Sequence, residues 1–170
     1  SIEQWMNITY YSDGTVKESY KQNDLKTAYI WDYKKSYPIA KVENVQSAGE
    51  IAYTSFETSE DWQSGGYNQW TYNTSAKKYF FPIVTGSMAY DLNYNSTPQT
   101  VTRSLDASKQ YVLSLWYNGS NLNVGGLTPV NGETIGPWTY KEYAVSGLSS
   151  IPISGTGLID ELRLYPKGAF

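Results

Sequence analysis

The chain has 170 residues, a formal net charge of −3, and neither Cys nor His. This length suits one domain with an appendage, and the missing residue types exclude disulfides, thiolate zinc sites and hydrolases that use a Cys nucleophile or a His base. The 13 basic and 16 acidic residues form no basic run, and no apolar stretch reaches the length of a membrane span, so neither nucleic-acid binding nor a transmembrane segment is expected.

Aromatic residues are the most informative part of the composition: 17 Tyr, 6 Trp and 4 Phe make up 16% of the chain. Tyr, Trp and Thr favour half-buried strands, whereas Asn, Ser and Gly favour turns. No long window repeats apolar residues at helical spacing. The composition is therefore typical of an extracellular all-β domain in which most aromatic side chains pack in the core.

Residues 1–48 are predicted to form an N-terminal β-hairpin unit. Its clearest feature is Asp13-Gly14, a strong hairpin signal between two strand-like runs. A hairpin or meander alone is only marginally stable, so this unit is expected to dock on the rest of the chain. The strand-like runs of the unit are 8–11, 15–20, 27–31 and 38–42.

Residues 49–166 are predicted to form the main domain, and residues 167–170 begin a C-terminal linker. Short strand-like runs alternate with turn residues, which favours two packed antiparallel sheets. The predicted strands are 51–56, 68–73, 78–84, 88–94, 99–104, 110–117, 121–124, 138–146, 149–154 and 157–165.

Strand alternation divides the faces of two of these runs, 110–117 and 138–146. One face of each is apolar and is expected to be core. The expected core residues are Tyr111, Leu113, Leu115 and Tyr117 in the first run, and Tyr143 and Val145 in the second. The opposite faces carry Val112, Ser114 and Trp116 in the first run, and Trp138, Tyr140 and Glu142 in the second.

Four motifs in chain order resemble jelly-roll carbohydrate-binding modules of the galactose-binding-like superfold. The run SFETSEDW at 55–62 is similar to their opening motif of Phe, Glu and Trp, and YVLSLW at 111–116 to their central strand. WTYKEY at 138–143 is similar to their penultimate strand, and IDELRL at 159–164 to their closing strand. The resemblance implies an antiparallel β-sandwich jelly roll and an oligo- or polysaccharide ligand.

A narrower resemblance covers the flanks of this module. The run 29–44 looks like the segment that precedes it in large bacterial YD-repeat (RHS-type) proteins, and YYSDG at 10–14 looks like a YD-repeat hairpin. The run DELRLYPKGA at 160–169 resembles the point where the repeats resume. These likenesses imply a monomeric fragment of a larger secreted or cell-surface bacterial protein, with the remainder of that polypeptide as a partner.

The jelly-roll resemblance also implies a structural Ca²⁺ where the first and last strands meet. Glu57, in the first motif, and Asp160, in the last, match its carboxylate ligands, and Ca²⁺ prefers such oxygen donors. Two alternatives remain open. Either Glu50 or Glu161 replaces one of the ligands, or Glu57 and Asp160 cap strands or pair with Lys or Arg.

A sugar-binding surface needs an aromatic plane beside hydrogen-bonding side chains, because sugars present apolar C–H faces flanked by hydroxyls. On the sheet face the candidates are Trp116 and Tyr140, with Ser114 and Glu142 as polar neighbours. In the loop around Ser64-Gly65-Gly66 the candidates are Trp62, Tyr67, Asn68 and Trp70. Tyr67 and Trp116 are favoured, whereas Trp70 and Trp138 match positions where the family often has a structural Trp.

No catalytic residues are predicted. Glu60-Asp61 and Asp160-Glu161 are adjacent acids, and neighbouring residues of a strand point to opposite faces, so neither pair would flank one glycosidic bond. The chain also has no nucleophile elbow. A pair of acids from distant strands stays open as an alternative.

The favoured function is thus a non-catalytic, lectin-like or adhesive carbohydrate-binding module held together by Ca²⁺. The alternatives are a structural spacer within a YD-repeat shell or a protein–protein adhesion domain, each without a glycan ligand, since fold does not fix function. Exposed coplanar aromatics in a groove would favour binding, whereas buried or scattered aromatics would favour the spacer.

Overall fold

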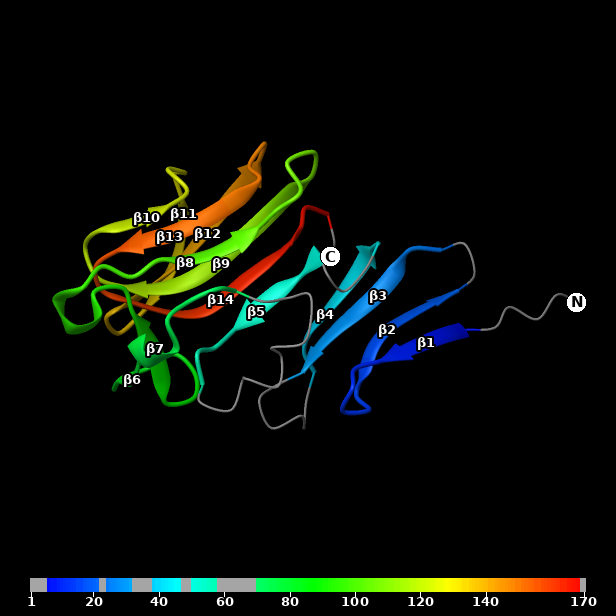
Figure 1. Ribbon diagram of the computed structural model, residues 1–170, viewed down its shortest axis with the longest axis horizontal. Helices are drawn as coiled ribbons and strands as arrows, with labels where there is room; N and C mark the ends of the chain where they lie inside the picture. Colours follow the sequence, from blue (N-terminus) through cyan, green and yellow to red (C-terminus); the bar gives the residue numbers. More distant parts are fainter. Residues whose placement is uncertain (1–5, 22–23, 32–37, 47–49, 58–69, 169–170) are drawn as a thin grey trace, which may run out of the picture.

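A computed structural model describes residues 6–21, 24–31, 38–46, 50–57 and 70–168 of the chain. These residues form three antiparallel sheets, of four, three and seven strands, together with two single-turn 3₁₀ helices (Figure 1). The all-β prediction is therefore confirmed. In the described part of the chain, no helix is long and apolar enough to cross a membrane.

The N-terminal unit is a four-stranded antiparallel meander, with one strand at each of the four strand-like runs of the sequence. Its first turn is the predicted one: Gly14 has a φ of 88°, and the Thr15 N–H donates to Asp13 Oδ1 at 2.8 Å. Gly tolerates this left-handed conformation without the steric cost of a side chain. The strands lie in chain order and are β1 (Met6–Tyr10), β2 (Val16–Lys21), β3 (Lys26–Trp31) and β4 (Pro38–Val45).

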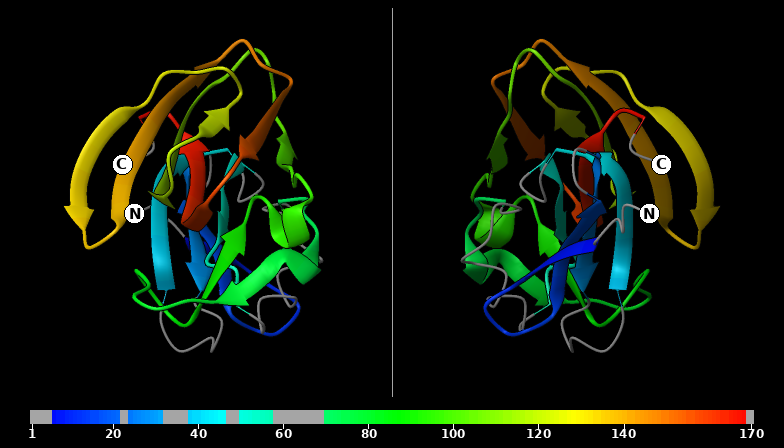
Figure 2. Two further views of the ribbon diagram at one scale, coloured as in Figure 1. Left: turned by 90° about the vertical axis from the view of Figure 1, so that its left-hand side faces the viewer. Right: turned by 90° about the vertical axis from the view of Figure 1, so that its right-hand side faces the viewer.

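The remaining strands form two sheets that pack as a sandwich. The three-stranded sheet has the order β10-β13-β8, and the larger sheet has the order β11-β12-β9-β14-β7-β6, with β5 paired to β14. Figure 2 shows how strongly the larger sheet curves, with β11 and β12 arching out on one side. The smaller sheet comprises β8 (Val101–Ser104), β10 (Leu122–Val124) and β13 (Ser150–Gly155). The larger sheet comprises β5 (Ala52–Thr54), β6 (Lys77–Tyr79), β7 (Met88–Asp91), β9 (Gln110–Asn118), β11 (Val130–Ile135), β12 (Trp138–Ser146) and β14 (Leu158–Pro166).

The main core lies between these two sheets, and the predicted core faces are confirmed. Ile151 and Ile153 on the smaller sheet pack against β9, β12 and β14 of the larger one. The predicted core residues are all buried: Tyr111, Leu113, Leu115 and Tyr117 on β9, and Tyr143 and Val145 on β12. Burying such side chains stabilises the fold by roughly 1.5–3 kcal/mol each before the entropy cost of folding is subtracted.

Strand β11 was not predicted, because Asn131-Gly132 is typical of a hairpin turn. In the structure this pair lies within the strand instead, and Asn131 pairs with Lys141. A Cβ atom at Gly132 would lie 2.6 Å from Cδ1 of Tyr140, so the Tyr140 ring occupies the space that a side chain would fill. Here Gly serves close packing across two strands rather than a turn.

Of the predicted strand 68–73, residues 68–69 lie outside the described part of the chain, and residues 70–73 form no strand; of the predicted strand 78–84, only residues 78–79 form one. Thr71 forms only an isolated bridge with Thr102, and β6 ends at Tyr79. The segment after β6 packs over the outer face of the large sheet instead: Phe80 lies edge-on to Trp138 at 6.0 Å, and the Trp138 indole N–H donates to the Pro82 carbonyl at 2.8 Å. Tertiary packing has overridden the strand propensity of this run.

A second, smaller core joins the N-terminal meander to the sandwich, as the docking argument predicted. Three residues of the meander and two residues in or next to β5 form this core, and one residue of β14 packs against it. These residues are Ala28, Val42 and Val45, then Ile51 and Tyr53, then Tyr165.

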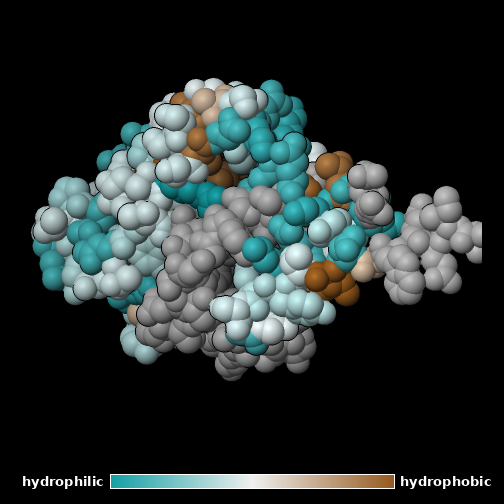
Figure 3. All heavy atoms as spheres, turned by 45° about the vertical axis from the view of Figure 1, so that its right-hand side comes forward, coloured by the Kyte–Doolittle hydropathy of each residue, from teal (hydrophilic) through white to brown (hydrophobic). Residues whose placement is uncertain are grey.

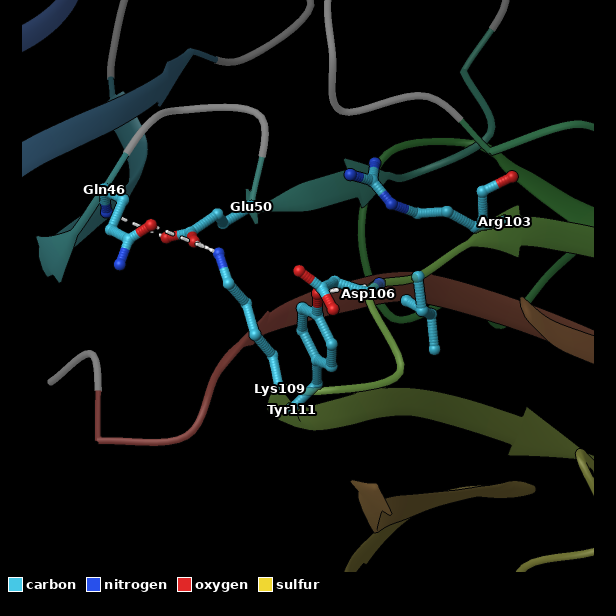
Figure 4. A pocket seen from close by; sticks show the side chains of 8 residues that line it. Gln46, Glu50, Arg103, Asp106, Lys109 and Tyr111 are labelled. Carbon is cyan, nitrogen blue, oxygen red and sulfur yellow. Dashed lines mark hydrogen bonds and ion pairs between the residues drawn. The ribbon is translucent and has the colours of Figure 1, made fainter. Parts of the chain in front are cut away.

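Polar contacts reinforce this joint around a pocket of about 290 Å³ (Figure 4). The Lys109 ammonium forms an ion pair with Glu50, and Glu50 accepts the Gln46 N–H at 2.8 Å. On the other side of the pocket, Asp106 accepts the Ser108 N–H at 2.9 Å. Because these acids are already engaged by groups of the chain itself, the pocket is best explained as part of the joint.

On the face that Figure 3 draws, the coloured surface is largely hydrophilic, and apolar residues gather only in small patches. Scattered exposed apolar side chains of this kind are normal for a folded domain. Among the described residues, the large exposed apolar side chains are Met6, Ile8, Tyr10, Leu25, Tyr79, Phe81, Val130 and Ile135.

Candidate functional site

The candidate site lies on the outer face of the large sheet, where β12, β9 and β14 run side by side (Figure 1). In the β12–β9 ladder Tyr140 stands opposite Trp116, and Glu142 stands opposite Ser114. Directly opposed residues of an antiparallel pair share a face. The structure therefore brings together the four sheet-face residues that the sequence proposed as a group.

The two aromatic rings of this group form a corner rather than a plane. Trp116 and Tyr140 are 5.5 Å apart between ring centroids and inclined at 62°, and both are half-buried. The Tyr140 hydroxyl donates to Glu142 Oε2 at 3.0 Å, and burial raises the pKa of this hydroxyl. A half-exposed ring beside a carboxylate offers one stacking surface and adjacent hydrogen-bonding atoms.

Strand β14 adds a cation that the sequence did not single out. Arg163 stands opposite Ser114 and keeps 46% of its side chain exposed. Its guanidinium lies 5.6 Å from the ring centroid of Tyr53, within reach of a cation–π contact, and donates to Glu161 Oε2 at 2.9 Å. The Tyr53 hydroxyl donates to the other oxygen of the Glu161 carboxylate at 2.7 Å. The position of Arg163 is thus fixed by two side chains.

A bulge in β14 explains why Arg163 and Glu161 lie together. The β9–β14 register shifts between Asp160 and Arg163, and Glu161 has a φ of 50°. Such a bulge breaks the alternation of faces. As a result, both acids contact Thr85: its N–H donates to Asp160 at 3.4 Å, and its hydroxyl donates to Glu161. The expectation that these adjacent acids point to opposite faces is therefore wrong.

Asp160 is a fully buried acid at the edge of this site. It accepts the Glu161 N–H at 2.8 Å, and no ion pair of the described residues involves it. Burial, followed by the nearby charges of Glu161 and Glu57, raises the pKa of Asp160 to about 8. A carboxyl group in this position gains from any cation that reaches it.

Glu57 lies beside the same turn of the chain, residues 85–88. Its Oε1 accepts the N–H groups of Ser87 at 2.8 Å and Met88 at 3.0 Å. Gly86 has a φ of +65°, and a Cβ atom there would lie 2.1 Å from Glu57 Oε1. The turn therefore closes over the Glu57 carboxylate only because residue 86 is Gly.

The donor set suits a hard cation but is incomplete on side chains alone. Ca²⁺ takes six to eight oxygens, which carboxylates, backbone carbonyls and water can supply. The described residues contain no group of three or more acids, His or Cys arranged to hold a metal, so Glu57 and Asp160 as Ca²⁺ ligands stay a prediction. Lys77 Nζ donates to the Glu57 carbonyl at 2.9 Å, so the ammonium group of Lys77 lies near the backbone of Glu57.

Other residues named from the sequence fall elsewhere. Glu50 belongs to the joint with the N-terminal meander, and Glu161 is paired with Arg163. Trp70 and Trp138 are buried, in agreement with the structural role that the resemblance implied. The loop candidates lie outside the described residues: Trp62, Tyr67 and Asn68.

Comparisons with known proteins do not assign the chain to a family. No known protein family matches the chain. No curated protein matches it either.

Replacing Gly86 with Ala should lower the free energy of unfolding by more than the strain of a left-handed Ala residue alone. Gly126 is a matched control, because its φ is +71° and a Cβ atom there would meet nothing within 4 Å. We expect Gly126→Ala to cost about 1–2 kcal/mol. Gly86→Ala should cost roughly 1 kcal/mol more, because it also displaces the Glu57 carboxylate from its hydrogen bonds. Urea denaturation measures both, and equal losses would contradict the Glu57 contact.

The raised pKa of Asp160 predicts that stability falls as pH rises in the absence of divalent cations. The pKa is about 8 in the folded protein, against an ordinary value of 3.8, so between these values the folded state binds more protons than the unfolded state. The free energy of unfolding should decrease over this range by at least about 1.4 kcal/mol, the equivalent of one pKa unit. Melting temperatures in EDTA measure this decrease. Asp160→Asn should flatten it, and an equal slope in the variant would refute the assignment.

Proposed function

We propose that the chain is a non-catalytic carbohydrate-binding module whose ligand lies on the outer face of the large sheet. The observation that carries this proposal is the convergence of Trp116, Tyr140, Glu142 and Arg163 on one partly exposed face. An aromatic ring with charged hydrogen-bonding groups beside it matches the apolar C–H face and flanking hydroxyls of a sugar. Because the two rings form a corner, one ring at most stacks on each sugar, which predicts weak binding to an oligo- or polysaccharide.

The wider setting belongs to the same proposal. A jelly-roll strand arrangement, a place in a secreted or cell-surface bacterial YD-repeat protein, and contacts with the rest of that polypeptide all rest on the resemblance of the sequence motifs. The packed antiparallel sheets of the sandwich and the four-stranded meander before them support this setting at the level of fold class.

A structural spacer is the second candidate, because one observation favours it directly. Ala28, Val42 and Val45 of the meander share a buried core with Ile51 and Tyr53 of the sandwich. A shared apolar core holds two units in a fixed orientation, which a spacer requires and a tethered lectin does not.

Structural Ca²⁺ held by Glu57 and Asp160 is also part of the proposal. Its support is the buried Asp160 carboxyl, which forms no ion pair among the described residues and lies beside the turn that Glu57 closes. A bound divalent cation would let Asp160 ionise at neutral pH and would join the start of the sandwich to its last strand. The residues of this chain would supply the two carboxylates, and carbonyls and water the rest.

A glycan array run on the purified chain tests the binding proposal. We expect reproducible hits, and Trp116→Ala should weaken the best of them at least about tenfold, or 1.4 kcal/mol, in calorimetry. Tyr79→Ala is the matched control, since this aromatic is 74% exposed on β6, at the far edge of the sheet. A blank array from a folded protein, or equal losses for both variants, would favour the spacer instead.

Calcium removal tests the metal separately from the glycan. Adding Ca²⁺ at pH 8 should raise the melting temperature, because the cation stabilises the ionised form of Asp160. Asp160→Asn and Glu57→Gln should each abolish this increase, whereas Glu50→Gln, at the joint, should retain it. No calorimetric heat with Ca²⁺ and an unchanged melting temperature would rule out the metal site.

A further inference from the structure

One edge of the N-terminal meander is open in the part of the chain that the structure describes. Strand β1 stands at the end of the order β1-β2-β3-β4 and pairs there with β2 alone. Figure 1 shows β1 on the side of the meander that faces away from the sandwich. The free edge of a strand presents backbone N–H and C=O groups that a further strand can bond. The chemistry of this surface therefore specifies a β-strand as its partner.

The turn after β1 shows which backbone groups face this edge. Tyr11 bonds toward the β2 side, because its N–H donates to the Thr15 carbonyl at 2.8 Å. In an antiparallel sheet, successive residues of a strand direct their backbone groups to opposite neighbours. The N–H and C=O groups of Met6, Ile8 and Tyr10 therefore point away from β2, toward the open edge.

The same three residues carry large exposed apolar side chains. The exposed fractions are 58% for Met6, 46% for Ile8 and 58% for Tyr10. Because the three residues alternate along the strand, their side chains form a row on one face of the sheet. This face is the one opposite the core shared with the sandwich, since the ladders align Ala28 of that core with Thr9.

Strand β1 also lacks the features that keep edge strands from pairing. Its sequence is MNITY, with no charged residue, Gly or Pro. Charged side chains, Pro, bulges and short length are the usual protections of a sheet edge. Each of the other strands at the ends of the described sheets has at least one of them. These features are Pro38, Lys41 and Glu43 on β4, Lys77 and Lys78 on β6, Arg103 on β8, Gly132 and Glu133 on β11, and a length of three residues for β10.

We propose that β1 pairs with β1 of a second copy of this chain, antiparallel and across a two-fold axis at Ile8. Ile8 then faces Ile8 of the second copy, Met6 faces Tyr10, and each pair exchanges N–H···O=C hydrogen bonds. A two-fold axis brings like residues together, so a charged strand would repel its own copy, whereas this neutral strand does not. Because both copies use the same strand, the contact closes at a dimer.

The dimer should be weak and reversible. One strand of five residues provides the contact, which falls well short of the roughly 1,200–2,000 Å² buried in stable interfaces. Cross-strand pairs contribute only about 0.2–1 kcal/mol each. The dimer would also present two copies of the candidate glycan surface to a polysaccharide. That consequence rests on the proposed function, whereas the dimer itself does not.

Sedimentation equilibrium of the purified chain, over a concentration series that reaches the millimolar range, tests the proposal. We expect a monomer–dimer equilibrium. Ile8→Lys places like charges on the two-fold axis and should raise the dissociation constant by about tenfold or more. Val130→Lys is the matched control, because Val130 is 74% exposed on β11, the edge of another sheet, and it should leave the equilibrium unchanged.

Ile8→Pro tests the backbone pairing separately from the side-chain contact. Pro removes only an N–H that points away from β2, so the meander should fold while the dimer is lost. Amide hydrogen exchange of the unmodified chain gives a second measurement. Protection of the Met6, Ile8 and Tyr10 amides should rise with protein concentration, whereas that of the Asn7 and Thr9 amides, which face β2, should not.

Three results would overturn the proposal. The first is a chain that stays monomeric throughout the concentration series, which would leave this edge to a strand of a different protein. The second is an equal effect of Ile8→Lys and Val130→Lys on the dissociation constant. The third is a dimer of unchanged strength in Ile8→Pro, which would place the contact on a face of the chain rather than on the edge of β1. Binding of glycans, or its absence, bears on none of these results.

Discussion

The pairing of β14 with β9 is the interaction on which the rest of the structure depends. Strand β14, the last of the chain, lies inside the large sheet and pairs with β9 on one side and with β5 and β7 on the other. Leu162 and Leu164 of β14 are buried in the main core, and Tyr165 packs against the core shared with the N-terminal meander. One strand therefore ties the sandwich, the meander and the candidate site together.

The bulge in this strand brings the acidic side chains of the candidate site together. Regular alternation would have put Asp160 and Glu161 on opposite faces, and the left-handed conformation of Glu161 brings both to Thr85 instead. The energy of such a conformation, of order 1–3 kcal/mol, has to be offset by surrounding contacts. Tyr53 and Arg163 provide them, since both hydrogen-bond the Glu161 carboxylate.

Sequence reasoning succeeded where the period of a regular strand decides the outcome. The faces of β9 and β12 follow from alternation, and with them the grouping of Trp116 and Tyr140. It failed where the chain departs locally from a regular strand or turn. Strand β11 replaced a predicted turn at Asn131-Gly132, and the bulge in β14 brought Arg163 to Glu161.

The consecutive residues Lys141 and Glu142 give β12 opposite charges on its two faces. On the outer face, Glu142 and the Glu161–Arg163 pair leave an excess of negative charge, which would disfavour any anion beside Trp116. On the core side, the Lys141 ammonium donates to Asn131 Oδ1 at 2.8 Å and lies 5.9 Å from the ring centroid of Tyr117. Alternation along the strand, acting on adjacent residues, is sufficient to keep these two charges on opposite faces of the sheet.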